Sequence, residues 1–79
     1  MIQDDILDQR AKHKEQWGGM WYDDTHNEKE WLWYMTVQLE KAVTAIENGD
    51  SNEYRNRIIR VMSLGYDALE SFDRKKAII

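Results

Sequence analysis

The stretch that decides the fold is residues 27–53, which read NEKEWLWYMTVQLEKAVTAIENGDSNE. Asn27 precedes an apolar run and Glu30 follows three positions later, which is the capping-box pattern of a helix start. Turn-forming residues then gather at 48–50, where the apolar pattern stops. The spacing predicts a helix over about 28–48, with an inward stripe made of Leu32, Met35, Leu39, Val43 and Ile46, and Ala42 beside it.

A second long helix follows the turn at once. Asp50 or Ser51 can cap it, and Glu53 again lies three residues past Asp50. We expect it over about 51–75, with Gly65 explained by the close approach of a neighbouring helix. Because the connection is short, the two helices should form an antiparallel hairpin. The inward stripe of the second helix is predicted to be Tyr54, Ile58, Val61, Met62, Leu69 and Phe72.

Residues 2–16 are polar and charged, with a thin apolar stripe that predicts a short amphipathic helix. Gly18 and Gly19 follow it, in the usual place of glycine past a helix end. The chain has no proline, which suits a mostly helical protein. The predicted fold class is therefore all-α: a short N-terminal helix plus a long antiparallel helical hairpin.

A chain of 79 residues makes one small domain, here residues 1–79, and its core rarely supplies more than roughly 3–5 kcal/mol. It has no cysteine, so disulfides and cysteine-based zinc sites are excluded. Some apolar residues of the hairpin fall outside the two stripes. We therefore expect a helical bundle formed in a homo-oligomer, a dimer or tetramer, using outer residues such as Trp33, Val37, Ile59 and Tyr66.

The net charge is −4, with 15 acidic and 11 basic residues. Binding to duplex DNA needs a basic face, so we do not expect duplex DNA as a partner. The N-terminus lacks the basic start and apolar run of a signal peptide, and no segment approaches membrane-spanning length. These features predict a cytoplasmic protein that does not associate with membranes.

The segment between the first two helices, residues 17–26, reads WGGMWYDDTH. Trp17 and Trp21 are candidates for stacking on a nucleobase, and the glycines let another group approach closely. Asp23, Asp24 and His26 are metal-ligand types at close spacing, but acids also suit the positive end of the following helix. The second interpretation is favoured, and no metal, cofactor or catalytic residue is predicted.

Arg55, Arg57 and Arg60 lie within two turns of the last helix, and Lys41 is expected across the hairpin from them. Such a group could be a solvated basic face or a phosphate-binding cluster, for which the planar guanidinium is well suited. The phosphate-binding interpretation is favoured. The full set of candidate ligand-binding residues is Trp17, Gly18, Gly19, Trp21, Asp23, Asp24, His26, Lys41, Arg55, Arg57 and Arg60.

The run from Gln16-Trp17-Gly18-Gly19 through Asp23-Asp24-Thr25-His26 to Glu30-Trp31-Leu32 resembles small phage and prophage proteins related to the all-α nucleotide pyrophosphohydrolases, the MazG-like group. The last helix, from Tyr54-Arg55 to Asp73-Arg74, also resembles the closing helix of that group. Catalytic members gather glutamates and an acidic pair around magnesium. In this chain the corresponding positions hold Val37, Gln38, Lys41, Arg57 and Ser63.

The resemblance therefore implies the fold without the metal-dependent hydrolysis, and it favours a protein that is not an enzyme. We expect a non-catalytic phage-type protein that binds a nucleotide or nucleotide-derived signal, with possible sequestration of a host defence signal in the host cytosol. Two alternatives stay open. One is a protein-interaction module or inhibitor of a host protein, and the other is a residual metal-dependent nucleotide pyrophosphohydrolase.

Overall fold

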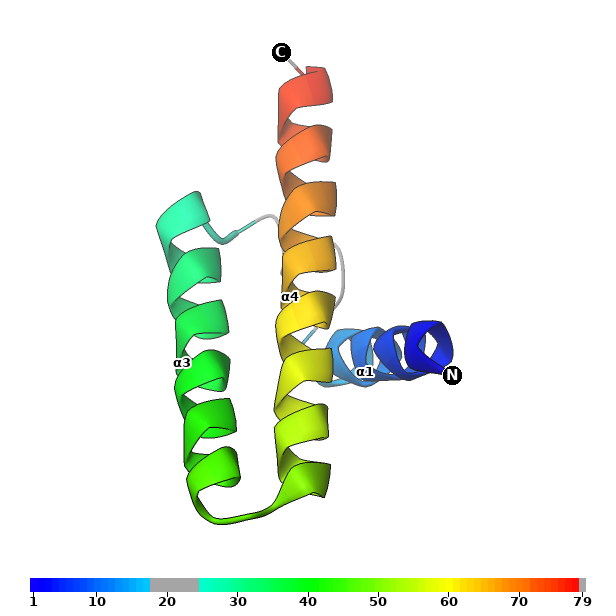
Figure 1. Ribbon diagram of the computed structural model, residues 1–79. Helices are drawn as coiled ribbons and strands as arrows, with labels where there is room; N and C mark the ends of the chain where they lie inside the picture. Colours follow the sequence, from blue (N-terminus) through cyan, green and yellow to red (C-terminus); the bar gives the residue numbers. More distant parts are fainter. Residues whose placement is uncertain (18–24, 79) are drawn as a thin grey trace.

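The computed structural model describes residues 1–17 and 25–78, and within these ranges the chain is all-α with three helices. They are α1 (Ile2–Trp17), α3 (Glu28–Glu47) and α4 (Ser51–Ile78). Helices α3 and α4 run antiparallel side by side, and α1 crosses α4 (Figure 1). This confirms the predicted short helix and long hairpin, and α4 extends three residues past its predicted end. No helix among the described residues is long and apolar enough to cross a membrane.

Local hydrogen bonds explain where α3 begins and ends. The Asn27 side chain accepts from the backbone N–H of Glu30, and the Glu30 carboxylate accepts from the N–H of Asn27, at 2.9 and 3.1 Å. At the other end Gly49 has φ of +70°, and the N–H groups of Gly49 and Asp50 donate to the carbonyls of Ile46 and Ala45. This is a Schellman motif, which satisfies the last carbonyls of the helix. Asp50 then caps α4, because its carboxylate accepts from the N–H of Glu53 at 3.0 Å.

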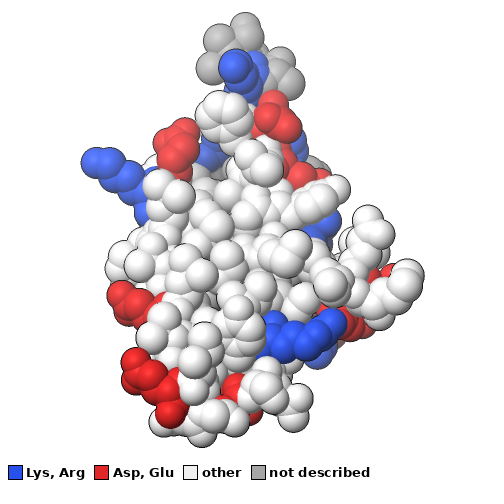
Figure 2. Space-filling view, in the orientation of Figure 1, with Lys and Arg blue, Asp and Glu red and all other residues white. Residues whose placement is uncertain are grey.

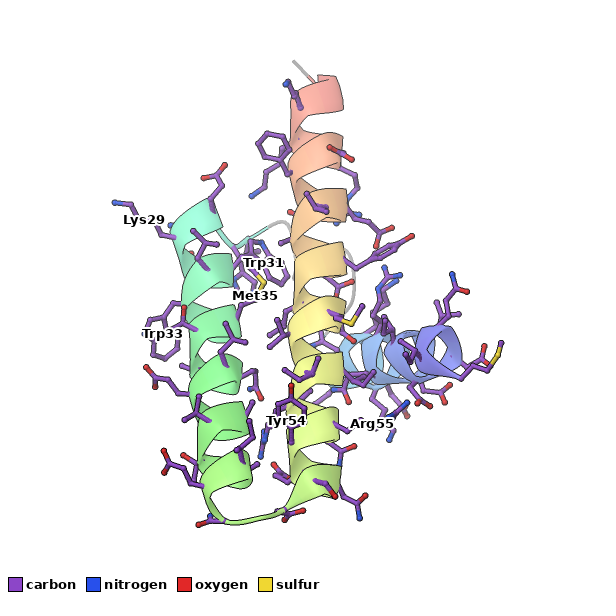
Figure 3. The ribbon with its side chains drawn as sticks, viewed as in Figure 1. Lys29, Trp31, Trp33, Met35, Tyr54 and Arg55 are labelled. Atoms are coloured by element: carbon purple, nitrogen blue, oxygen red, sulfur yellow. The ribbon has the colours of Figure 1, made fainter. Side chains whose placement is uncertain are left out.

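The line of contact between α3 and α4 differs from the predicted one. On α3 the buried residues are Trp31, Ala42 and Ala45, while most of the predicted inward stripe is exposed. The exposed members are Leu32, Leu39, Val43 and Ile46. The small side chains of Ala42 and Ala45 allow the helix backbones to approach closely. In Figure 3, Trp31 and Met35 lie between the two helices and Trp33 points away from α4.

On α4 the predicted inward stripe is also wrong in part. Ile58 and Val61 are half-buried, but Tyr54, Met62, Leu69 and Phe72 are exposed. The most buried residues of α4 form a different stripe, because α1 covers that side of the helix. This stripe is Ile59, Ser63, Asp67 and Ser71, at intervals of four residues.

Gly65 of α4 faces Met35 of α3. A Cβ atom built on Gly65 would lie 3.7 Å from Met35 Sδ, which is ordinary van der Waals distance. Gly65 therefore faces α3, but an alanine would fit there at ordinary contact distance, so the expected close approach of a neighbouring helix does not account for the glycine.

Candidate functional site

A cleft with a volume of about 450 Å³ opens between α1, the first half of α3 and the middle of α4. Helix α1 contributes polar side chains to it, α3 contributes aromatic ones, and α4 contributes a mixed set. His26, just before α3, lines it as well. The lining residues carried by the helices are Gln9, His13 and Gln16 from α1, Trp31, Trp33, Tyr34, Val37 and Gln38 from α3, and Arg60, Ser63, Leu64 and Asp67 from α4.

An aromatic cluster forms one end of the cleft. The ring of His26 meets those of Trp31 and Tyr34 edge-on, with centroids 5.2 and 5.4 Å apart. Trp33 packs edge-on against Tyr34 at 5.6 Å, although most of its own surface is open to solvent. Edge-to-face contacts of this kind hold aromatic rings in fixed orientations. The cluster therefore gives the cleft a rigid apolar wall that ends in the exposed ring of Trp33.

His26 is buried and held from two sides. Lys75 Nζ donates to its backbone carbonyl at 2.5 Å, and Glu30 Oε2 lies 3.7 Å from its Nδ1. The first contact ties the end of α4 to the residue just before α3. His26 is therefore fixed in the cleft wall by both long helices.

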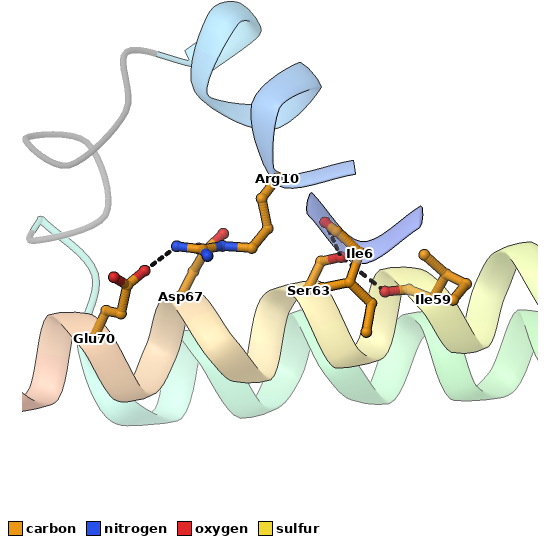
Figure 4. Close-up of polar contacts among 6 residues, drawn as sticks. All are labelled: Ile6, Arg10, Ile59, Ser63, Asp67 and Glu70. Atoms are coloured by element: carbon orange, nitrogen blue, oxygen red, sulfur yellow. Dashed lines mark hydrogen bonds and ion pairs between the residues drawn. The ribbon is translucent and has the colours of Figure 1, made fainter. Parts of the chain in front are cut away.

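The opposite wall is α1, and Arg10 fixes α1 to α4 (Figure 4). Its Nε donates to Asp67 Oδ1 at 2.7 Å, its Nη2 pairs with Glu70, and its guanidinium carbon lies 4.0 Å from the centre of the Tyr66 ring. Burial by itself lowers the pKa of Arg10, but the hydrogen bond to Asp67 and the nearby negative charges outweigh it and leave the pKa raised. The Ser63 hydroxyl adds a second link, 3.4 Å from the Ile6 carbonyl oxygen and 2.8 Å from that of Ile59.

Only part of the predicted site gathers at this cleft. Among the predicted residues with described side chains, His26 and Arg60 line it. Arg60 is exposed and forms no ion pair with any other described residue, so its guanidinium is available to an anion. Lys41 is exposed and does not line the cleft.

The other two arginines of the predicted cluster are engaged by acids. Arg57 pairs with Glu53 and donates from Nη1 to Gln38 Oε1 at 3.0 Å, across the hairpin. Arg55 lies beside α1 (Figure 3), and its Nη2 is 2.7 Å from Asp5 Oδ2. The hydrogen bond from Arg55 is the main reason that the pKa of Asp5 lies below its ordinary value.

The remaining predicted residues lie outside what the structure describes. Gly18, Gly19, Trp21, Asp23 and Asp24 belong to the undescribed segment 18–24, and the side chain of Trp17 is likewise undescribed. Within the described ranges, no three histidine or acidic side chains come together as a metal-binding group.

Several cleft residues were missed from the sequence. His13 is half-buried in the cleft wall and Trp31 is buried there, and neither was among the candidate site residues. Arg10 and Asp67 were not singled out. One signal was available, because Ser63, Asp67 and Ser71 recur every four residues beside Ile59 and so form a polar stripe that another helix can cover.

Comparison of the chain with protein-family models, with curated proteins and with solved structures finds no match. Over the described residues, the fold is three helices, with an aromatic-walled cleft beside an arginine that pairs with no described acid. The resemblance to the MazG-like group stays a prediction from the residues.

Proposed function

We propose that this protein binds a small nucleotide-like anion, with a flat ring and a phosphate, in the cleft and does not convert it chemically. The observation that carries the proposal is that one cleft is lined both by an exposed aromatic ring, Trp33, and by a guanidinium, Arg60, that forms no ion pair with any described residue. A nucleotide carries a flat ring and a phosphate, and these two side chains suit those groups.

The aromatic wall supports recognition of the base. Stacking of a base on an aromatic side chain is worth roughly 1–3 kcal/mol and tolerates different bases. Trp33 is 63% exposed at the mouth of the cleft, so a ligand ring can reach it without moving the helices. The amides of Gln9 and Gln16 supply donors and acceptors for base or ribose edges on the wall facing it.

Arg60 supports recognition of the phosphate. Arginine binds phosphate through paired N–H donors, and such charge-assisted hydrogen bonds are about twice as strong as neutral ones. The volume of about 450 Å³ lies within the range of small-molecule sites. The cleft can thus accommodate a mononucleotide-sized ligand.

The pattern of residues at the hydrolase-like positions supports binding over turnover. Three of the positions where the MazG-like resemblance expects acidic metal ligands line the cleft, and they hold Val37, Gln38 and Ser63. None of these side chains is a carboxylate that could hold magnesium. Capture without turnover would suit a phage-type protein that sequesters a nucleotide-derived signal.

The test is calorimetric titration of the protein, in EDTA, with nucleotides, cyclic dinucleotides and ADP-ribose derivatives. We expect saturable binding of at least one compound. Arg60→Ala and Trp33→Ala should each weaken it by roughly 10–100-fold, since each removes about 1–3 kcal/mol. Lys41→Ala is the matched control, because Lys41 is an exposed cation on α3 that does not line the cleft, and its loss should leave affinity unchanged. Absence of heat across the panel, or equal losses in Lys41→Ala and Arg60→Ala, would contradict the proposal.

A further inference from the structure

Helix α3 carries a row of large apolar side chains that nothing in the described chain covers. Leu32, Leu39, Val43 and Ile46 are between 47% and 62% exposed. At about 100° per residue they lie roughly a quarter of a turn from Ala42 and Ala45, which contact α4. They therefore form one flank of α3 instead of being scattered around it.

Helix α4 carries a matching row. Tyr54, Met62, Leu69 and Phe72 are between 40% and 66% exposed. They lie well around the helix from Ser63, Asp67 and Ser71, the side that α1 covers. We call the two rows together the open face.

The two rows lie on the same side of the hairpin. Helices α3 and α4 are antiparallel, and each row is rotated around its own helix axis, away from the α3–α4 contact, in the direction that brings it to that side. Figure 2 shows this side as a broad uncharged surface over the hairpin, with charged groups at its margins. Trp33 and Val37 are offset in the opposite sense on α3, so the cleft is on the other side of the molecule.

We propose that the open face is the surface on which a second copy of this chain docks, giving a four-helix core made of two hairpins. A large side chain at half exposure leaves on the order of 100 Å² open, given the roughly 150–250 Å² that an aromatic residue can bury. The eight side chains then offer roughly 800 Å², which is the share of one partner in a standard protein interface. Monomers rarely leave an apolar patch above about 600 Å² uncovered.

A second copy fits this surface because the face is complementary to itself. Its eight residues are uncharged. Lys76, whose Nζ lies 5.7 Å from the centre of the Phe72 ring, is an exposed side chain near the end of α4 that can stay in solvent, so two copies can pack face to face. The chain also needs the added core. Among the described residues the buried apolar side chains are only Trp31, Ala42, Ala45 and Ile59, and the sequence has no cysteine to form a disulfide. A second copy docked on the open face would add apolar burial to this small core.

The inference is independent of the proposed ligand, because the open face and the cleft lie on opposite sides of the hairpin. It also differs from the expectation formed from the sequence, which assigned the interface to outer residues such as Trp33 and Val37. Trp33 lines the cleft and lies outside the open face. It therefore provides the control.

The first experiment is sedimentation equilibrium of the unmodified chain over a wide concentration range, together with thermal unfolding at the same concentrations. We expect a mass of at least twice 9.5 kDa and a Tm that rises with protein concentration, because association stabilises the folded state by mass action. A folded monomer at every concentration, with a constant Tm, would overturn the proposal. That result would leave the face for a different partner protein.

The second experiment compares Met62→Glu, in the α4 row of the open face, with Trp33→Glu, an equally drastic change on the cleft side. We expect Met62→Glu to shift the protein to monomer or to unfolded chain, and Trp33→Glu to keep the oligomer. The opposite pattern would assign the interface to the cleft side and refute the proposal. Spin labels on Met62→Cys and Trp33→Cys test the same interface without breaking the oligomer. Each label attaches at one site, since the natural chain has no cysteine. The labels at 62 should be closer together across the dimer than those at 33.

Discussion

Arg10 of α1 and Asp67 of α4 form a buried ion pair, with Nε and Oδ1 2.7 Å apart and the Asp67 side chain almost fully enclosed. The two residues are 57 positions apart in the sequence. A buried charge is tolerated only when it is paired, so each residue makes the burial of the other possible. This pair holds α1 on the hairpin and with it one wall of the cleft.

Removing Arg10 should therefore be costly. We expect Arg10→Met to lower the free energy of unfolding by about 3–5 kcal/mol, because Asp67 is left buried and unpaired. Urea denaturation measures the loss. Lys12→Met, on the same helix but exposed, should change it by less than about 0.5 kcal/mol. The double variant Arg10→Met/Asp67→Leu should be more stable than Arg10→Met alone, and an equal or larger loss would contradict this account.

The two described glycines predict opposite effects of alanine. Gly65→Ala should stabilise the protein by up to about 1 kcal/mol, since the new methyl group reaches Met35 at ordinary contact distance and improves helix propensity. Gly49→Ala should destabilise it by about 1–2 kcal/mol, because φ of +70° is unfavourable for a residue with a Cβ. Chemical denaturation of both variants tests the pair. Destabilisation by Gly65→Ala would show that the approach to Met35 is tighter than described.

The ion pair between Arg55 and Asp5 predicts a pH dependence. The pKa of Asp5 is lowered in the folded protein, so the pair contributes stability above the ordinary aspartate pKa and loses it as the pH falls through the lower folded-state pKa. NMR titration of the Asp5 carboxyl should give a low midpoint in the natural chain. In Arg55→Gln the midpoint should move up towards the ordinary value, and an unchanged midpoint would exclude Arg55 as the cause.

The cap of α3 predicts a local loss of stability. Asn27→Ala removes the acceptor for the Glu30 N–H and should cost about 0.5–2 kcal/mol. Asp50→Ala should act in the same way on α4, because its carboxylate caps Glu53. Asn52→Ala is the control, since Asn52 is exposed and makes no described capping bond. Circular dichroism during thermal unfolding compares the three variants.

Local signals in the sequence were enough to predict the elements of this fold. The caps at Asn27 and Asp50 and the turn at Gly49 act through neighbouring residues, so α3, α4 and their antiparallel pairing could be predicted. Which face of each helix packs against its neighbour could not be predicted. Apolar residues occupy more than one side of α3, and the sequence does not tell a side that packs on α4 from one that needs another partner.

The cleft depended on contacts that no short window of sequence contains. Arg10 reaches Asp67 and Lys75 reaches His26 across most of the chain, so the residues at the cleft could not be assigned together. The arginine cluster was predicted by its spacing alone. Spacing does not reveal that acids engage Arg55 and Arg57 while no acid in the described part of the chain pairs with Arg60.

The distant anchoring of α1 has a consequence for affinity. When α1 docks on α4, it closes a long loop of chain, and the loss of conformational entropy opposes docking. The two helices of the hairpin are joined by a tight turn, so their pairing carries a smaller entropic cost. Gln9, His13 and Gln16 belong to α1, so the cleft is complete only in the fraction of molecules whose first helix is docked. Apparent affinity scales with that fraction, and a ligand that bridges α1 and α3 must in turn slow hydrogen exchange along α1.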